Sequence, residues 1–237
     1  SEQSEALARD RENARYLSGV EFPESLEVVS SLEAAIAGSD LVVLAVPSKG
    51  MRWAIETASP FIADSQPILS VAKGLEADTA KRMSTVISEV MPGHPAAVLS
   101  GPNLAREVAA EIPTTPVIAA DDEALGRQMQ EVFMCETFRV YTNRDVVGVE
   151  VAGALKNIVA IGAGISDGMG FGDNTKAALV TRGLAEITRL GVAMGARAPT
   201  FQGLAGIGDL IATCASPHSR NHMVGLRLAR GEKAGAI

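Results

Sequence analysis

Hydrophobic and polar positions in the first half of the chain alternate in blocks typical of strands and helices. Residues 26–46 hold a short β-branched run, a serine able to cap a helix, an amphipathic Ala/Leu segment ending at Gly38, and the apolar run LVVLAV. A run that is apolar on both faces is typical of a parallel strand buried between helical layers. We therefore predict a strand, a helix and a strand in succession.

The same alternation continues to residue 142. Strands are predicted from PILSVAK, AAVLS, TPVIAA and FRVYT, and helices are predicted near 49–58, over 78–90, from 103, and over 121–133. Alternation of this kind predicts an open α/β fold, with a doubly wound parallel sheet covered by helices on both faces.

Strand signals stop at Asp145, where long Gly- and Ala-rich helical patterns begin. We predict two domains, an α/β domain at 1–142 and an all-helical domain at 143–237. Small residues would let the first of these helices approach its neighbours closely, so we expect it to be the buried centre of the second domain: Gly148, Ala152, Gly153, Ala160 and Gly164.

Composition narrows the class of protein. With 47% hydrophobic residues, the 237-residue chain can build a sizeable core. A formal net charge of −7 and the lack of a Lys/Arg run argue against a general nucleic-acid binder. Any anionic ligand must then be met by a local basic pocket.

Compartment and membrane signals are weak. Cys135 and Cys214 lie far apart with no CxxC spacing, which favours a reducing, cytoplasmic location over a disulfide framework. The apolar stretch 151–165 is interrupted by Lys156 and Asn157, and it is shorter than the ~20 residues that a bilayer requires. We expect no membrane span.

Unusual turns follow three of the predicted strands. They contain Pro47-Ser48, Lys73-Gly74 and Gly101-Pro102-Asn103. Pro and Gly also end strands for purely structural reasons. In open α/β sheets, however, ligands bind outside the carboxyl ends of the strands, so we expect these turns to line one cleft, with Lys73 reaching into it.

Lys156 stands in the otherwise apolar segment VAGALKNIVAIGAG. An ammonium is costly to bury unless it is paired or has a chemical task. The alternative is a lysine that reaches solvent along the helix surface. Apolar neighbours on most sides favour a functional group.

Two further constellations follow in the helical half. Asp209 begins an apolar run after GLAGIG, where it could bind a ligand or serve only as a helix cap. Ser219, Arg220 and Asn221 precede the amphipathic MVGLRLAR. A helix N-terminus with a guanidinium and an amide suits a phosphate, although an ordinary capped surface helix is the alternative.

Two other patterns carry no function in this interpretation. The GxGxxxG at 162–168 is one residue too long for a dinucleotide-binding loop and follows a helix. His218 and His222 lie four apart without a third ligand, so we expect no metal site and place them in solvent or in the anion site.

Several motifs together closely resemble NAD(P)-dependent glycerol-3-phosphate dehydrogenase of the bacterial type. They are RENARYL, VLAVPS, AKGLE, SGPNLAREVA, FRVY, GALKN, DNTKAAL, TFQGLAGIGDLIATC and SRN, and they cover nearly the whole chain. The resemblance implies a partial Rossmann-like domain followed by an all-α domain of the 6-phosphogluconate dehydrogenase-like type. It also implies NAD or NADP as cofactor and a possible homodimer.

The implied reaction interconverts dihydroxyacetone phosphate and sn-glycerol 3-phosphate for phospholipid synthesis. By this resemblance Lys156 is the proton acceptor and Asp209 orients it while binding the substrate. Oxidation of a secondary alcohol needs such a base on the hydroxyl while hydride leaves the carbon. To act as a base Lys156 must lose its charge, which burial and a cationic neighbour such as Lys73 favour.

The resemblance also implies contacts for the remaining site residues. Lys73 contacts substrate and cofactor, Gly101 and Asn103 contact substrate, and Ala105 contacts cofactor. Ser219, Arg220 and Asn221 take the phosphate end, and Arg220 also reaches the cofactor. The family usually has Ser or Thr where this chain has Asn103.

The family's Gly-rich phosphate loop and C-terminal helices have no counterpart in the sequence. We therefore expect a fragment that binds NAD(P)H poorly and is nearly inactive alone. Two alternatives stay open: a related dehydrogenase acting on another hydroxy acid or sugar acid, and a non-catalytic dehydrogenase remnant. The sequence does not distinguish NAD from NADP.

Overall fold

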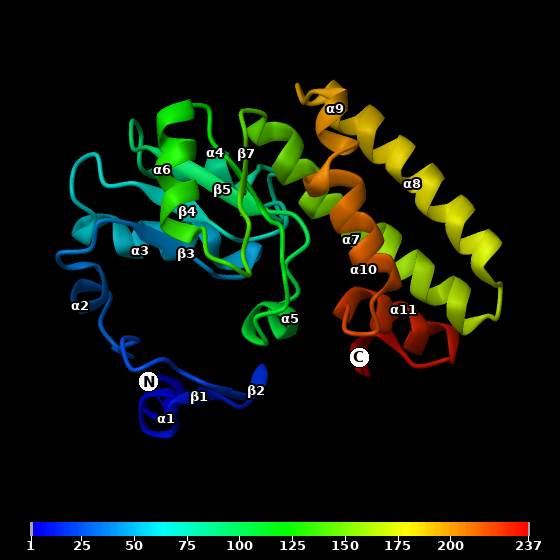
Figure 1. Ribbon diagram of the computed structural model, residues 1–237, viewed down its shortest axis with the longest axis horizontal. Helices are drawn as coiled ribbons and strands as arrows, with labels where there is room; N and C mark the ends of the chain where they lie inside the picture. Colours follow the sequence, from blue (N-terminus) through cyan, green and yellow to red (C-terminus); the bar gives the residue numbers. More distant parts are fainter. Residues whose placement is uncertain (1, 237) are drawn as a thin grey trace.

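A five-stranded sheet forms the centre of the first half in the computed structural model, which describes residues 2–236 (Figure 1). The strands lie in sequence order: β3 (Val42–Leu44), β4 (Ile68–Ser70), β5 (Ala96–Ser100), β6 (Val117–Ala119) and β7 (Tyr141–Asn143). Strands β3, β4 and β5 are parallel, with Leu44 opposite Ser70 and Ser70 opposite Val98. Their carboxyl ends therefore share one edge of the sheet.

One strand pair departs from the predicted doubly wound parallel sheet. Strand β6 runs antiparallel to β5, with Leu99 opposite Ile118, and β7 is parallel to β6. A parallel return needs a crossover that spans the sheet, usually a long helix. The connection between β5 and β6 holds only the short helix α5 (Ala105–Ala109), so the chain turns back along the same edge.

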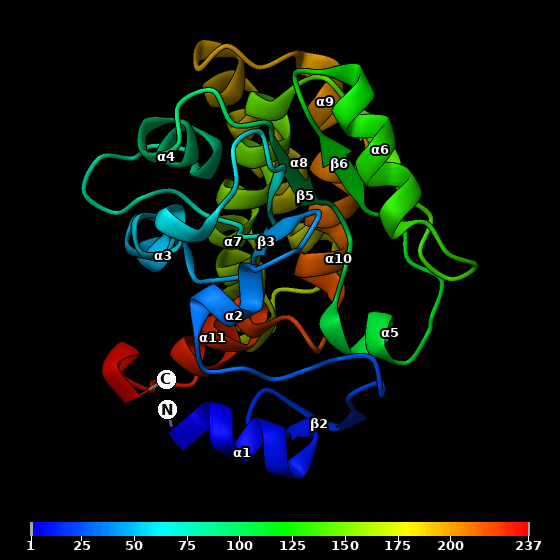
Figure 2. The same cartoon turned by 90° about the vertical axis from the view of Figure 1, so that its left-hand side faces the viewer.

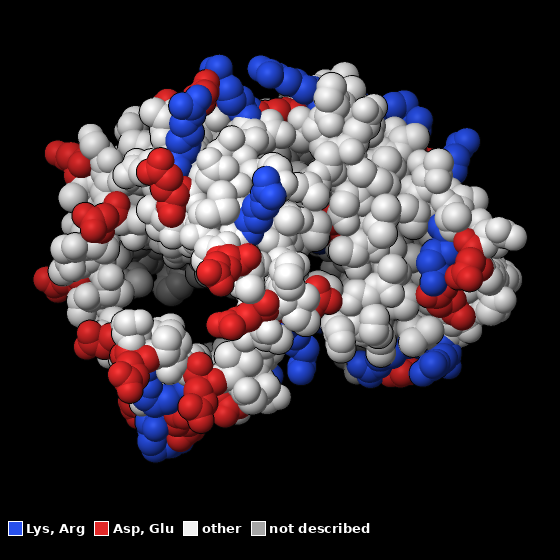
Figure 3. Space-filling model, viewed as in Figure 1, with Lys and Arg blue, Asp and Glu red and all other residues white. Residues whose placement is uncertain are grey.

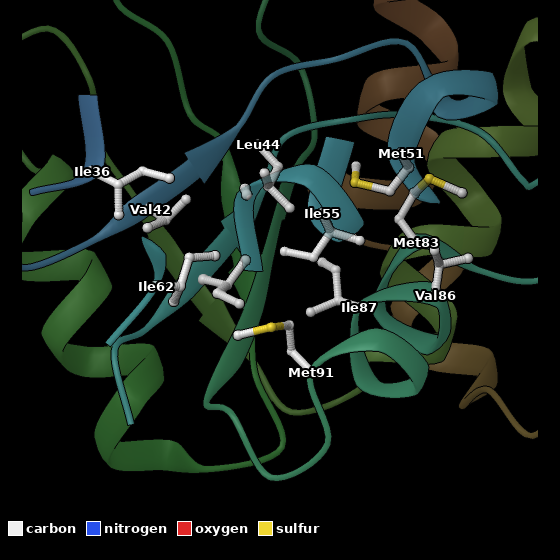
Figure 4. Close-up of a cluster of buried hydrophobic side chains, with 12 residues drawn as sticks. Ile36, Val42, Leu44, Met51, Ile55, Ile62, Met83, Val86, Ile87 and Met91 are labelled. Carbon is white, nitrogen blue, oxygen red and sulfur yellow. The ribbon is translucent and has the colours of Figure 1, made fainter. Parts of the chain in front are cut away.

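Helices cover both faces of the sheet, as a doubly wound fold requires (Figure 2). On one face, α3 (Met51–Ala58) and α4 (Met83–Val90) pack with β3 and β4, and Figure 4 shows their buried side chains meeting. On the other face, α6 (Glu123–Phe133) packs against Leu69, Leu99 and Ile118.

The N-terminal residues lie at the margin of the sheet body (Figure 2). They form α1 (Glu2–Asp10), the antiparallel pair β1 (Glu12–Asn13) and β2 (Leu17–Glu21), and the short helix α2 (Leu32–Ile36). Helix α2 is capped by Ser31 as predicted. The strand predicted before it is wrong: residues 26–29 join no sheet, and Leu26 and Val29 are exposed because no neighbouring strand lies beside them.

Short turns precede or flank two of the predicted helices. The helix predicted over 78–90 begins only at Met83, because residues 76–81 close a tight loop in which the Glu76 amide donates to the Lys81 carbonyl at 2.9 Å. The 3₁₀ turns η1 (Ser48–Gly50) and η2 (Ser59–Phe61) flank α3.

The second half is helical, as predicted. Its elements are α7 (Val146–Gly168), α8 (Asp173–Ala193), α9 (Ala198–Phe201), the π-helical turn η3 (Leu204–Gly208), α10 (Asp209–Ala215), α11 (Arg220–Ala229) and the 3₁₀ turn η4 (Ala234–Ala236). Helix α7 runs from the sheet to the far helices (Figure 1). Its first turn buries Val146 and Val149 against β5 and β6.

Glycines let α7 and α11 touch closely. A Cβ on Gly164 would lie 2.0 Å from the His222 carbonyl oxygen, and one on Gly225 would lie 2.0 Å from the Ile161 carbonyl oxygen. The predicted close approach at Gly164 is therefore confirmed. By length and composition α7 also qualifies as a membrane-spanning helix, a test that the core helix of a soluble protein passes as well.

Candidate active site

Lys156 is buried at the centre of α7, with 6% of its surface exposed. Its Nζ donates to Asp209 Oδ1 at 2.5 Å and to Thr213 Oγ1 at 2.7 Å, and both acceptors belong to α10. The alternative of a lysine that reaches solvent is therefore wrong for this chain. Close packing of α7 on α10 through Ala160, Ala163 and Leu210 removes the water that the ammonium would otherwise contact.

Asp209 is the most buried charged group of the site, with 2% of its surface exposed. It is the first residue of α10, whose N-cap position is taken by Gly208 without any side-chain cap. Asp209 is therefore not the N-cap residue, although it is an acidic residue of the first turn. Its Oδ1 accepts from Lys156 and its Oδ2 from Lys73 at 2.9 Å, so one carboxylate joins two lysines from the two halves of the chain.

The turn η3 explains the glycines that precede Asp209. A Cβ on Gly206 would lie 2.2 Å from the Phe201 carbonyl oxygen, so only glycine lets this turn close against α9. The turn then delivers Asp209 to the buried face of α10.

Lys73 joins the turns at the carboxyl edge of the sheet. Its Nζ donates to the Gly101 carbonyl at 2.8 Å, to Asn103 Oδ1 at 2.7 Å and to Asp209. A Cβ on Gly74, where φ is +154°, would lie 2.5 Å from Ser48 Oγ. The turns after β3, β4 and β5 lie close together, with Lys73 among them, as expected. That they line one cleft stays a prediction.

Two lysines share one carboxylate, and this affects the ionisation of Lys73. Burial lowers the pKa of Lys73 to about 8, opposed by the attraction of Asp209 and reinforced by repulsion from Lys156. With both lysines protonated, the cluster carries one net positive charge, which favours an anionic ligand.

The predicted anion site lies apart from this cluster. Ser219 is buried and caps α11, where its Oγ accepts from the His222 amide at 3.3 Å. Arg220 is exposed and Asn221 is half-buried. Among residues 2–236 no hydrogen bond joins this segment to Lys73, Lys156 or Asp209.

The spacing between the two sites follows from helix geometry. The His222 carbonyl lies against Gly164, which is eight residues beyond Lys156 on α7. At ~1.5 Å per residue, this corresponds to about 12 Å along the helix axis.

Ala105, the predicted cofactor contact, is the first residue of α5. It is exposed and lies two residues beyond Asn103.

Sequence reasoning missed several polar partners. Thr213 lies one helical turn beyond Asp209, so its i,i+4 spacing was a usable signal. Glu150 is buried in α7 and accepts from Arg82 Nη1 at 2.7 Å and from Ser84 Oγ at 2.6 Å. Of the two alternatives for His222, the solvent-exposed one is wrong, because its ring is buried beside Asp167. Its place in the anion site stays a prediction.

Charged side chains are dispersed over one face of the molecule. On the face drawn in Figure 3, lysines and arginines lie singly or beside acidic side chains and form no continuous basic patch.

Two family models match the chain. Residues 1–126 match the NAD-dependent glycerol-3-phosphate dehydrogenase N-terminus, and residues 145–237 match the C-terminus of the same family. Among curated relatives, a glycerol-3-phosphate dehydrogenase [NAD(P)+] of Sphingopyxis alaskensis is 51% identical over 237 residues, which cover 100% of this chain and 71% of the relative. One from Chlorobium limicola is 51% identical over 231 residues, covering 96% of this chain and 69% of the relative.

Solved structures give the same picture. The crystal structure of glycerol-3-phosphate dehydrogenase from Coxiella burnetii superposes with a TM-score of 0.96 at 38% identity, covering 100% of this chain and 72% of that one. The glycerol-3-phosphate dehydrogenase of Saccharomyces cerevisiae gives a TM-score of 0.83 at 30% identity, covering 99% and 70%.

Proposed function

The chain belongs to the NAD-dependent glycerol-3-phosphate dehydrogenase family, and we propose that Lys156 and Asp209 form the acid–base pair of its reaction. Its function is that of a glycerol-3-phosphate dehydrogenase [NAD(P)+], which interconverts dihydroxyacetone phosphate and sn-glycerol 3-phosphate with NAD or NADP. The fold agrees with this assignment, since an α/β Rossmann-like domain precedes a helical one. The observation that carries the catalytic proposal is the buried Lys156–Asp209 contact of 2.5 Å.

Lys156 moves the proton. In the oxidation direction its neutral amine accepts the hydroxyl proton of glycerol 3-phosphate, and in reduction its ammonium returns a proton to the oxygen formed from the ketone. Asp209 Oδ1 stabilises the ammonium, and the carboxylate thereby orients Nζ. Thr213 donates its own proton to the Asp209 carbonyl at 2.6 Å, which leaves its oxygen free to accept from Lys156.

The turns at the carboxyl edge of β3, β4 and β5 fit the nicotinamide end of the cofactor. Lys73 reaches this edge with 20% of its side chain exposed, and Ser48 and Gly74 lie beside it. NAD(P), when bound, supplies or accepts the hydride. In our proposal Lys73 contacts both substrate and cofactor, Gly101 and Asn103 contact the substrate, and Ala105 contacts the cofactor.

Ser219, Arg220 and Asn221 are proposed to bind the phosphate. They begin α11, a helix of ten residues, and the exposed guanidinium of Arg220 is available for a charge-assisted contact. Arg220 is also proposed to reach the cofactor. The substrate class itself, a small phosphorylated molecule, follows from the family.

The domain division, the cellular location and the oligomeric state also belong to the proposal. A division into domains at 1–142 and 143–237 is supported to within a few residues, since β7 ends at Asn143 and α7 starts at Val146. A cytoplasmic location is supported by the free, exposed thiol of Cys135. A homodimer stays a prediction, which sedimentation equilibrium tests directly.

The defining assay follows oxidation of NADH and of NADPH with dihydroxyacetone phosphate. The 237-residue chain is measured beside a chain extended to the length of its relatives with their flanking segments. Turnover that requires Lys156 supports the proposed mechanism, and the ratio of the two rates gives the preferred cofactor. Unchanged turnover in Lys156→Ala contradicts the acid–base role.

The same assay separates the two alternatives from the assignment. If Arg220→Ala leaves the KM for dihydroxyacetone phosphate unchanged, a related dehydrogenase without a phosphate contact at Arg220 is favoured. If glycerol 3-phosphate binds but the extended chain shows no turnover with either cofactor, the non-catalytic alternative is favoured.

A further inference from the structure

A second charged cluster joins three helices and has no part in the mechanism above. His222 Nε2 of α11 lies 2.8 Å from Asp167 Oδ2 at the end of α7, and the same oxygen accepts from Lys176 Nζ of α8 at 2.8 Å. The His222 residue is buried, with 8% of its surface exposed. It directly follows Asn221, so the cluster adjoins the segment proposed to bind phosphate.

Three separate contacts fix His222. Its ring is held by Asp167, its amide donates to Ser219 Oγ at 3.3 Å, and its carbonyl lies where a Cβ on Gly164 would come within 2.0 Å. A residue held at ring, amide and carbonyl has little freedom to rotate. The adjacent turn that carries Arg220 and Asn221 is therefore fixed from one side.

The charges of the cluster favour a stable contact between Asp167 and His222. Burial acts to raise the pKa of Asp167, but the hydrogen bonds from Lys176 and His222 outweigh it and lower that pKa. The carboxylate is thus ionised at neutral pH. His222 Nδ1 is buried and has no hydrogen-bond partner within residues 2–236. A ring that carries its proton on Nε2 leaves only an acceptor at Nδ1.

Other roles fit less well. Asp167 lies 11 residues beyond Lys156 on α7, which is too far for direct acid–base chemistry. Within the described residues no group of three or more His, Cys, Asp or Glu side chains is placed to hold a metal ion. Through His222 the cluster contacts the start of α11.

We propose that Asp167 and His222 are positioning residues that orient Ser219, Arg220 and Asn221 toward the substrate phosphate. This inference rests on the phosphate-binding role proposed above for that segment. The Asp167–His222 contact acts on these residues through the backbone. Its loss therefore changes substrate binding and leaves proton transfer at Lys156 unaffected.

The test compares His222→Ala, His222→Gln and Asp167→Asn in the form of the enzyme that turns over. We expect His222→Ala and Asp167→Asn to raise the KM for dihydroxyacetone phosphate about tenfold, because small displacements of binding groups have large effects. We expect kcat and the KM for NADH to change less than about twofold. His222→Gln, which retains an N–H donor for Asp167, is expected to restore most of the affinity.

Two controls make the result specific. His218→Ala changes an exposed histidine of the same segment and should leave all constants unchanged. Dihydroxyacetone lacks the phosphate, so its kcat/KM should be equal in wild type and His222→Ala. A kcat/KM that falls equally for both substrates would overturn the proposal.

The outcomes also distinguish this inference from the function on which it rests. If Arg220→Ala leaves the KM unchanged, the phosphate role of the segment fails. If Arg220→Ala raises the KM but His222→Ala and Asp167→Asn match wild type, only the positioning role fails. A lower melting temperature with unchanged KM would show a purely structural cluster. Asp167→Asn decides the matter if His222→Ala does not fold.

Discussion

The lysine cluster and the predicted phosphate site differ in how far their side chains are exposed to solvent. Lys156 and Asp209 are 6% and 2% exposed and hydrogen-bond to each other, whereas Arg220 is exposed. A proton-transfer group needs a fixed, desolvated geometry, because its pKa and its direction must both be set before substrate arrives. A phosphate arrives strongly hydrated and needs donors that are still accessible.

The two regions are built differently for the same reason. The cluster lies where the interior faces of α7 and α10 meet a turn of the sheet, so three elements enclose it. The phosphate site lies on the first turn of one helix, where backbone amides face outward. Substitutions in the first region should therefore affect kcat, and substitutions in the second should affect KM.

Removal of the proposed base gives the largest expected effect. Lys156→Met keeps the volume of the side chain but cannot carry a proton, so kcat should fall about a thousandfold. Isothermal calorimetry with glycerol 3-phosphate should show nearly unchanged affinity. A large loss of affinity with unchanged kcat would show that Lys156 binds substrate and does not transfer the proton.

Next in size is the contact that fixes α7 to the sheet body. In Glu150→Gln, the buried carboxylate that pairs with Arg82 and Ser84 is lost, and the free energy of unfolding should fall by about 3 kcal/mol. Glu123→Gln is the control, because Glu123 and Arg127 form an exposed pair worth less than about 1 kcal/mol. Equal losses in urea unfolding would show that burial does not matter here.

Arg220→Ala tests the accessible region. Loss of charge-assisted hydrogen bonds should raise the KM for dihydroxyacetone phosphate about 10- to 100-fold with little change in kcat. Arg230→Ala, at the opposite end of α11, should leave the KM unchanged. Matching effects from both variants would point to general electrostatic attraction, with no specific contact at the helix start.

The smallest effect concerns Lys73. Because the pKa of Lys73 is lowered to about 8, the folded chain binds fewer protons than the unfolded chain between pH 8 and the ordinary lysine range. Stability contributed by this group should therefore rise with pH in that window, by at most about 1.4 kcal/mol per pH unit. Melting curves of wild type and Lys73→Met at several pH values should differ by this slope, and parallel curves would contradict it.

Much of this fold could be predicted from local patterns. Apolar runs located the five strands, and punctuation by Lys73 and Gly101 located the edge where they end. Strand direction could not be predicted at β6, because a β-branched run reads alike in both directions. The isolated Val28-Val29 run also lacked the information that decides a strand, namely a neighbour to pair with.

Some residues of the candidate site could likewise be predicted from the sequence, and others could not. A lysine in an apolar helix was a sound signal for burial, and the structure supplied Asp209 and Thr213 as its partners. Asp209 itself was ambiguous, since a cap and a ligand look alike until the partner helix is known. Glu150 carried the same signal as Lys156, a charge among apolar residues, and could have been recognised by it.

Helix α7 passes both regions, and an α-helix cannot be stretched. The count of residues between Lys156 and Gly164 sets the separation of the two regions, and each added residue rotates all that follows by about 100°. A one-residue insertion or deletion there would turn Gly164 away from α11. This stretch of the chain therefore tolerates no change in length.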